Sequence, residues 1–294
     1  MANETKYTFK KEKAEVRVVY LGTRYKIDVS EIDFSQSFKE TSFEVKTIQN
    51  QSSFEGSVIN QANAAEFSLN TPLLAEPTNR VMFDRLIDSA SFDLYISTQY
   101  DVWKLETCVI QDGTFEINRR RPLRLSISGE ASKLSKWTDS IPGSDPTATT
   151  TTYIVPRIST LTLGSDDISH SVVSISAEVQ NDINWNEYNT IHGAHTSTNA
   201  ATSMYPSTFY TGTRVLAGSI GKYLEKGSTS LLTWDNNTSL RMIAGNGTQG
   251  LDFNITSCSF TNRMSSGDTF KEEYNWRMTP SQTAFNTQLT YTTT

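Results

Sequence analysis

Two of the three histidines are the side chains best placed in this sequence for metal chemistry. His192 and His195 stand three positions apart, a spacing that can chelate zinc. They lie in a stretch rich in Ser, Thr and Asn, with only Asp182 and Glu187 nearby. Two solvated loop imidazoles explain this pattern more simply, and His170 stands alone near the start of an expected strand. A zinc-dependent hydrolase using His192 and His195 is therefore the less favoured alternative.

Other signatures of catalysis are missing from the sequence. It contains no G-x-S-x-G elbow, no Walker loop and no CxxC motif. Carboxylates occur as neighbours, as in Asp166-Asp167 and Glu272-Glu273, but adjacent residues of a strand face opposite sides and make poor acid–base partners. We therefore predict a protein that is not an enzyme and that needs no metal or cofactor.

The two cysteines close similar patterns in the two halves of the chain. An aromatic residue stands five positions before each cysteine and an aliphatic residue three positions before it (Trp103 and Leu105 before Cys108; Phe253 and Ile255 before Cys258). Two cysteines in equivalent strands of separate domains are not placed for a mutual disulfide. We predict two small buried apolar thiols.

The similarity between the halves extends beyond the cysteines. Four more pairs of segments align, and the spacing between partners is nearly constant except for one change partway along the chain. The pairs are Val16–Gly22 with Ile158–Gly164, Ile32 with Ile175, Thr47-Ile48 with Thr190-Ile191, and Leu125–Ile127 with Tyr274–Trp276. This change in spacing falls near the polar stretch 192–206, a natural place for an insertion. We infer a duplicated module; a chance likeness between two antiparallel β domains is the alternative.

Length and composition give the boundaries. A chain of 294 residues suits two domains of ordinary size. Residues 138–152 are mostly Pro, Ser, Thr and Gly, a linker composition. We predict one module over 1–137, a linker over 138–152 and a second module over 153–294. The uncharged, Thr-rich end from residue 280 is expected to be a tail, or a C-terminal arm that orders against a neighbour.

Alternation of apolar and polar residues predicts strands through most of both halves. One helix is expected in each half. Asn79–Asp88 carries an apolar stripe at i,i+4 spacing, and Ser219–Lys226 is a weaker candidate that Gly227 would end. The predicted fold class is mainly β: two tandem similar antiparallel β-sandwich or barrel-like modules, each with one short α-helix.

The charge excludes some partners. The formal net charge is −6, divided evenly between the halves, so no basic face is expected to bind phosphate tightly. The one basic run, Arg119-Arg120-Arg121, occupies the place that Asp268 holds in the second half. This pairing could join like modules through opposite charges; a solvated hairpin and a DNA contact are the alternatives. The sequence shows no signal peptide and no membrane span, which predicts a soluble chain made in the cytoplasm without a membrane anchor.

Together these features resemble the tail tube proteins of long-tailed bacteriophages, in the form in which two tube domains are fused. The segments that carry the resemblance are the strand series Val16–Thr47 and its echo Ile158–Thr190, the helix Asn79–Asp88, and the cysteine strands Trp103–Cys108 and Phe253–Cys258. The resemblance covers nearly the whole chain, although no single motif is diagnostic.

The resemblance implies a structural subunit of the virion tail, made in the host cytoplasm. It implies self-assembly into stacked pseudo-hexameric rings, built as trimers, beside other tail proteins, around a channel that double-stranded DNA passes without specific binding. It also implies a long loop in each module that reaches the adjacent ring. These loops would be Lys46–Gly56, with Gln49, Asn50, Gln51 and Ser52, and Glu187–Pro206, with His192 and His195.

Other functions fit the same sequence. A tube initiator, a tube terminator or another baseplate ring protein would share the repeat, and copy number per virion would separate these. A two-domain β adhesin or carbohydrate-binding protein would need exposed aromatic residues on one face. The sequence leaves open the ring symmetry, the lumen-facing residues, the presence of a contractile sheath and the host.

Overall fold

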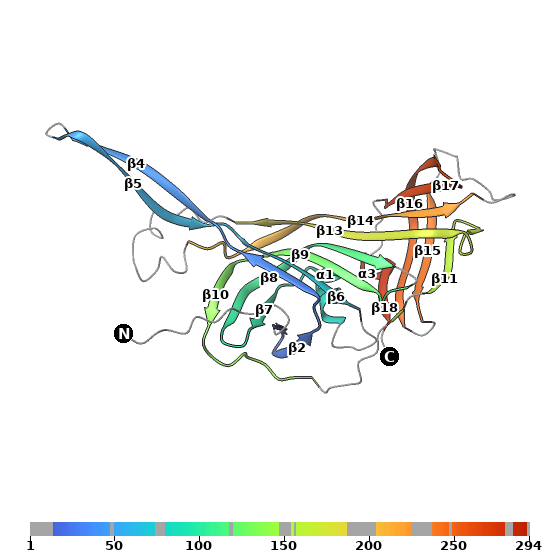
Figure 1. Ribbon diagram of the computed structural model, residues 1–294, viewed down its shortest axis with the longest axis horizontal. Helices are drawn as coiled ribbons and strands as arrows, with labels where there is room; N and C mark the ends of the chain where they lie inside the picture. Colours follow the sequence, from blue (N-terminus) through green and yellow to red (C-terminus); the bar gives the residue numbers. More distant parts are fainter. Residues whose placement is uncertain are drawn as a thin grey trace.

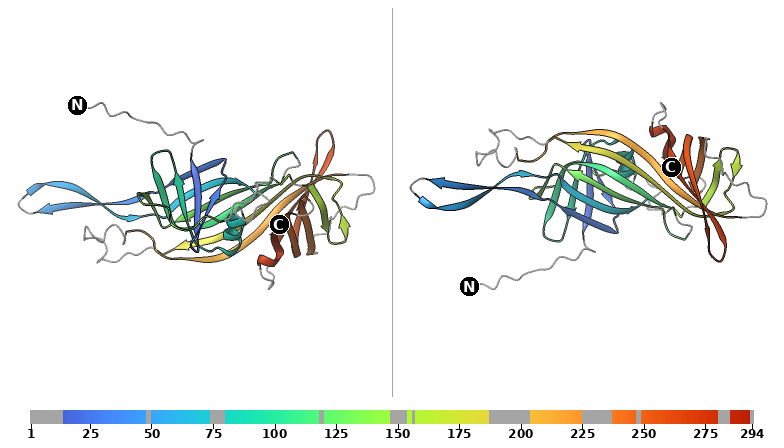
Figure 2. Two further views of the ribbon diagram at one scale, coloured as in Figure 1. Left: turned by 90° about the horizontal axis from the view of Figure 1, so that it is seen from below. Right: turned by 90° about the horizontal axis from the view of Figure 1, so that it is seen from above.

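The computed structural model describes residues 14–47, 50–73, 80–117, 120–146, 154–155, 157–186, 204–224, 237–246, 249–279 and 285–292. The fold is mainly β, as predicted, and every pair of named strands is antiparallel. Sixteen of the described strands belong to one connected sheet, and two form a separate ribbon. Figure 1 shows this ribbon projecting far from an elongated body, and both views in Figure 2 agree.

The first half contains ten strands and one helix among its described residues. They are β1 (Glu15–Tyr20), β2 (Thr23–Ile27), β3 (Glu31–Ser35), β4 (Phe38–Thr47), β5 (Asn50–Ala62), β6 (Ala65–Pro72), α1 (Arg80–Asp88), β7 (Phe92–Ser97), β8 (Val102–Ile117), β9 (Arg124–Ala131) and β10 (Lys133–Trp137). The strands β4 and β5 form the projecting ribbon. The helix begins within one residue of its predicted start, because its apolar stripe at i,i+4 spacing has a core to cover.

The second half contains eight described strands. They are β11 (Arg157–Leu163), β12 (Asp166–Asp167), β13 (Val172–Trp185), β14 (Phe209–Tyr223), β15 (Thr238–Gly245), β16 (Gly250–Ser266), β17 (Phe270–Met278) and β18 (Leu289–Thr292), with the short helix α3 (Phe285–Gln288) before β18. In Figure 1, β13 and β14 run along the length of the body.

The two halves follow one scheme of strand pairing. In the first half the pairs are β1·β2, β1·β7, β7·β8, β8·β9, β9·β6, β6·β3 and β8·β10. In the second half they are β11·β12, β11·β15, β15·β16, β16·β17, β17·β14, β14·β13 and β16·β18. Each pair of the first set has its counterpart in the second, in the same chain order.

The cysteines hold equivalent positions in this scheme. Cys108 of β8 pairs with Phe92, and the register then shifts by one residue before Leu105 pairs with Leu94. Cys258 of β16 pairs with Thr238, and the same shift precedes the pairing of Ile255 with Leu240. Both thiols are fully buried, and burial raises the pKa of Cys108 well above its ordinary value and that of Cys258 to about 12.

The alignment of the last strand pair was off by two residues. The sequence matched Ile127 with Trp276, but in the ladders Gly129 pairs with Ile110 while Trp276 pairs with Phe260. Ile110 and Phe260 stand at equal distances from their cysteines, so Trp276 is the counterpart of Gly129. Alternation alone cannot detect such an error, because a shift of two residues keeps every side chain on its face.

The halves are joined into one sheet and one core. Residues 112–117 of β8 pair with residues 175–180 of β13, so the sheet runs from the first half into the second. The Phe115 ring meets the Phe253 ring edge-on at 6.0 Å between centroids, and Phe83 of α1 lies 5.5 Å from Tyr291 of β18. Apolar residues of both halves therefore bury one another.

Polar side chains of the second half close the end of α1. Asn181 of β13 donates its amide to the carbonyls of Leu86 and Ile110, at 3.1 and 3.0 Å. Arg214 of β14 donates to the carbonyls of Leu86 and Ile87 and to the amide oxygen of Asn181. The last carbonyls of a helix lack partners within the helix, and a cation there suits the helix dipole. Desolvation lowers the pKa of Arg214.

Residues 139–146 of the predicted linker are held against the turn between β1 and β2. The Arg24 guanidinium binds both carboxylate oxygens of Asp145, at 2.7 and 2.8 Å, and also the carbonyl of Ile141 at 2.9 Å. The backbone amide of Arg24 donates to the carbonyl of Ser144. This part of the connection is therefore fixed to the first half.

Two secondary-structure predictions were wrong. Residues 219–223 of the predicted second helix belong to strand β14, and the remaining three residues include two outside the described ranges. Leu216 and Ile220 are buried at a spacing that suits either a helix or a strand. In the predicted C-terminal arm, residues 289–292 form β18 against the chain's own β16, because Leu289 and Tyr291 are buried in the core.

Candidate assembly surfaces

Eight neighbouring strands give the molecule a continuous polar face. They lie in the order β3, β6, β9, β8, β13, β14, β17, β16, and their side chains alternate between core and outside, as in β9, where every second residue is buried. One transverse row across all eight strands reads Glu31, Asn70, Ser126, Thr114, Glu178, Ala217, Arg277, Ser259. This row crosses both halves and contains one apolar residue.

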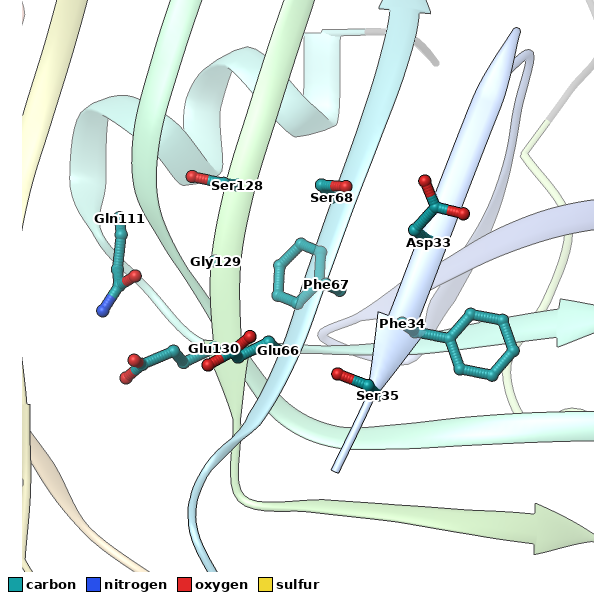
Figure 3. Close-up of a pocket in the computed structure, with 10 residues that line it drawn as sticks. All are labelled: Asp33, Phe34, Ser35, Glu66, Phe67, Ser68, Gln111, Ser128, Gly129 and Glu130. Carbon is teal, nitrogen blue, oxygen red and sulfur yellow. The ribbon is translucent and has the colours of Figure 1, made fainter. Parts of the chain in front are cut away.

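An acidic hollow of about 330 Å³ lies on this face near the β3 edge (Figure 3). Glu66 of β6 pairs directly with Glu130 of β9, and Asp33 of β3 lines the same hollow. Partial burial raises the pKa of Glu130, and the negative charge of Glu66 adds to the effect. Like charges placed directly opposite destabilise a sheet, so this end of the face favours a positively charged partner.

The other end of the eight-strand run carries positive and apolar groups. Arg263 of β16 binds Glu273 of β17 at 2.6 Å with its side chain 74% exposed, and Lys271 lies beside Ser265. Met264 is 48% exposed and Phe270 is 62% exposed. Exposed apolar side chains of this size at the end of a sheet are typical of a surface that another chain covers.

Both ends of the run are open sheet edges among the described residues. Strand β3 pairs with β6 on one side, and no other described strand pairs with it. Residues 259–266 of β16 pair with β17 on one side, whereas β15 and β18 pair with earlier residues of β16. Unpaired strand edges are templates for pairing with another chain.

The predicted loop Lys46–Gly56 is mostly a β ribbon. Lys46-Thr47 and residues 50–56 belong to β4 and β5, and Val45 pairs with Phe54. Asn50, Gln51 and Ser52 therefore begin a strand, while Gln49 lies outside the described residues. A two-stranded ribbon is held by backbone hydrogen bonds, so a mostly polar sequence does not prevent it, and the segment that the resemblance gave as a loop is largely strand. The ribbon does extend away from the body (Figure 2).

The other predicted contact residues are placed only in part. His192, His195 and Arg119 lie outside the described residues, and Arg120 and Arg121 are exposed in the connection from β8 to β9. Asp268 is exposed in the equivalent connection from β16 to β17. Arg120, Arg121 and Asp268 thus lie in equivalent connections of the two halves, and a contact between copies stays a prediction.

The described part of the chain offers no metal cluster. No group of three or more His, Cys, Asp and Glu side chains gathers there in a way that could hold a metal ion. Among the helices that the structure describes, none has the length and apolar character to cross a membrane.

Sequence reasoning missed the two open edges and their charges. Glu31, Asp33 and Arg263 alternate with apolar residues in their strands, which predicts a half-exposed strand but does not say which strand ends a sheet. That information lies in the pairing of distant segments. The usable signal was the repeat itself, because equivalent strands must have equivalent neighbours.

Two halves with one pairing scheme, open sheet edges and a projecting ribbon are typical of structural proteins that assemble with other chains. The chain matches the Bacteriophage Baseplate Tube Protein Family over residues 5–293, and it belongs to this family. It is therefore a structural component of the phage tail and baseplate. None of the curated proteins matches it.

Proposed function

We propose that this chain forms trimeric rings of pseudo-sixfold symmetry that stack into the tube of the tail or its baseplate. The observation that carries the proposal is the shared scheme of seven strand pairs. Two duplicated modules in one chain occupy quasi-equivalent positions, so three chains supply six modules. Contacts of this head-to-tail kind close into a ring when the rotation between neighbours is the right fraction of a turn.

The polar face of the eight-strand run is the proposed wall of the channel. Its outward residues are mainly Ser, Thr, Asn and acidic side chains, and the chain has a net charge of −6. A wall of this kind repels DNA phosphates weakly and offers them few cations, so double-stranded DNA passes without specific binding. The function is assembly of a conduit in the virion from chains made in the host cytoplasm, and it requires no catalysis.

The β4–β5 ribbon is the proposed contact between stacked rings. It extends beyond the body in every view (Figures 1 and 2). An isolated two-stranded ribbon is marginally stable in water, so a ribbon of this length gains stability from a neighbouring surface. The segment with Gln49, Asn50, Gln51 and Ser52, and the segment with His192 and His195, are the proposed contact sites.

Electron microscopy of the purified full-length chain, alone and with neighbouring tail proteins, tests the proposal. We expect rings with three copies of the 32.9 kDa chain and a central channel, and short tubes when rings stack. A chain that stays monomeric under all these conditions would contradict the ring. Deleting residues 42–57 should leave rings but abolish stacking; loss of the rings themselves would contradict the role given to the ribbon.

The family description favours a tube segment within the baseplate over the long body of the tail tube. The two locations differ in copy number, because a baseplate segment contributes one or a few rings and a tube body contributes many. Quantitative mass spectrometry of virions separates them. One or a few trimers per virion would place the chain in the baseplate, and tens of trimers would place it in the tube body.

A further inference from the structure

The chain contains a complete example of one junction between its halves, which we call the internal seam. The internal seam joins β8 to β13 in an antiparallel ladder whose six pairs run from Gln180 opposite Asp112 to Ile175 opposite Ile117. Thr114 pairs with Glu178 and Glu116 pairs with Ser176 on the polar face. Phe115 and Ala177 pair on the core side, where both are fully buried or nearly so.

The common pairing scheme states which strands would form the same junction elsewhere. β16 occupies the place of β8, and β3 occupies the place of β13. These two strands carry the open edges, at opposite ends of the eight-strand run. The open edge of β16 in the second half is therefore equivalent to the β8 edge that forms the internal seam. The open edge of β3 in the first half is equivalent to the β13 edge that forms it.

The ladders also fix which residues are equivalent. Ile127 pairs with Gly113 and Leu69, and its counterpart Tyr274 pairs with Asn262 and Ile220. Leu69 pairs in turn with Ile32 and Ile220 pairs with Ile175, so Ile32 and Ile175 are equivalent. Following both strands from these anchors gives the counterparts of the seam residues: Met264 for Phe115, Arg263 for Thr114, Ser265 for Glu116, Asp33 for Ser176, Phe34 for Ala177 and Ser35 for Glu178.

We propose that β3 of one copy pairs with β16 of a second copy in the register of the internal seam. This inference rests on the proposed ring and names its contact. Asp33 then stands opposite Ser265, Phe34 opposite Met264, and Ser35 opposite Arg263. We call this contact the outer seam. A ring of three copies has three internal and three outer seams in alternation.

Charge complementarity supports a second copy as the partner. On the polar face, Ser35 pairs with Glu66 within its own copy, and Glu66 pairs with Glu130. Arg263 placed opposite Ser35 brings a guanidinium beside this pair of carboxylates. One position along the face, Ser265 has Lys271 as its neighbour and would stand opposite Asp33. The acidic edge of β3 therefore meets a cationic side chain at two places.

The apolar side supports the same register. Met264 is 48% exposed in the single copy, and Phe34 is half-buried, packed at its ring against Trp103 with 6.4 Å between centroids. In the internal seam their counterparts are a large residue on the β8 side and a small one on the β13 side. The outer seam instead has large residues on both sides, which buries the exposed Met264 against Phe34.

Engineered disulfides test the outer seam. Directly opposed residues of an antiparallel pair have Cβ atoms about 4.5–5.5 Å apart, near the range that a disulfide requires. We expect the full-length variant Ser35→Cys/Arg263→Cys to give disulfide-linked dimers and trimers on a non-reducing gel, with trimer as the end point. Thr114→Cys/Glu178→Cys is the matched variant in the internal seam and should cross-link within one copy.

A shifted pair makes the test specific for register. Ser35→Cys/Ser259→Cys moves one cysteine four residues along β16 and should give no linked oligomer, and the native thiols are buried and should not react. If rings form but the shifted pair links and the Ser35/Arg263 pair does not, the proposed register is overturned while the ring stands. If neither pair links and the protein stays monomeric by sedimentation, the ring itself is contradicted.

A charge exchange gives an independent readout. Arg263→Glu should weaken ring assembly, and adding Glu66→Arg in the same chain should restore it, because the two charges are then exchanged across the outer seam. Sedimentation velocity at several protein concentrations measures the effect. If the double variant does not recover ring assembly, although circular dichroism shows that each variant folds, the charge contact is overturned.

Discussion

The two halves share their strand order but fill equivalent places with different side chains. In the first half Phe67 of β6 pairs with Gly129 of β9, and its ring covers the space that a Cβ on Gly129 would need, with Cζ 2.6 Å away. In the second half the roles are exchanged: Gly218 of β14 pairs with Trp276 of β17, whose ring lies 2.7 Å from the same point. What is preserved is one aromatic ring over one glycine.

A second equivalent pair differs in chemistry. Thr71 and Leu125 pair in the first half, both buried. Their counterparts Lys222 and Glu272 pair in the second half as an ion pair of 3.4 Å with almost no exposure. The strand-pairing scheme therefore accommodates either an uncharged or an ionic pair at this place.

The largest effect is expected from breaking that ion pair. Lys222→Thr leaves the Glu272 carboxylate in the core without its cation, although Asn262 still donates to it at 3.3 Å. We expect a loss of about 3–5 kcal/mol in the free energy of unfolding, measured by urea denaturation. Adding Glu272→Leu copies the pair of the first half and should recover most of this loss.

The partly exposed pair Arg241–Asp252 serves as the control for ion-pair removal. Its side chains are 37% and 29% exposed, so Arg241→Thr should cost less than about 1 kcal/mol. A double variant Lys222→Thr/Glu272→Leu that is no more stable than Lys222→Thr would show that the two halves do not accept the same pair.

An intermediate effect is expected at the glycines beneath the rings. Gly129→Ala and Gly218→Ala each place a Cβ within 3 Å of an aromatic ring and of a backbone oxygen, and each should cost about 1–3 kcal/mol. Thermal unfolding measures both. Gly267→Ala is the matched control, because nothing lies within 4 Å of the added atom. A large loss of stability at only one of the two glycines would show that the two sites are not equivalent.

The smallest effect is expected at the connection between the halves. The Arg24 guanidinium, mainly through its hydrogen bond, holds the pKa of Asp145 below its ordinary value. A lowered folded-state pKa stabilises the fold above the ordinary carboxyl pKa, and this contribution is lost as the pH falls through the folded value. Asp145→Asn should therefore make the midpoint of urea unfolding less dependent on pH between about pH 6 and pH 3. If the variant's urea midpoint depends on pH as the parent's does in this range, the Arg24–Asp145 contact does not stabilise the fold in solution.

Strand positions could be predicted from the sequence because they depend on local alternation. The cysteine strands are the clearest example, since β8 and β16 share both their burial and their register shift. The helix α1 was also predicted, because Met82 and Leu86, like Phe83 and Ile87, stand at i,i+4 spacing and all four are buried.

The failures share a physical cause. Ser219–Tyr223 and Leu289–Thr292 have too few apolar residues for their period to separate helix, strand and tail, and neighbouring strands decide their structure. In the ribbon β4–β5 the alternating Phe43 and Val45 indicate a strand, but residues 49–53 are all polar and give no strand signal. The edge positions of β3 and β16 follow from pairing between distant segments, so the candidate outer seam could not be predicted from either strand alone.

The covalent link makes the internal seam different in kind from any contact between separate molecules. Each copy is synthesised with that ladder already within reach, so its formation loses no translational freedom and depends on no concentration. The internal seam consequently has no rival partners to reject, and its polar rows contain Ser, Thr, Gln, Asp and Glu but no Lys or Arg. Discrimination between correct and incorrect neighbours then falls on the open edges alone, where the opposite charges lie.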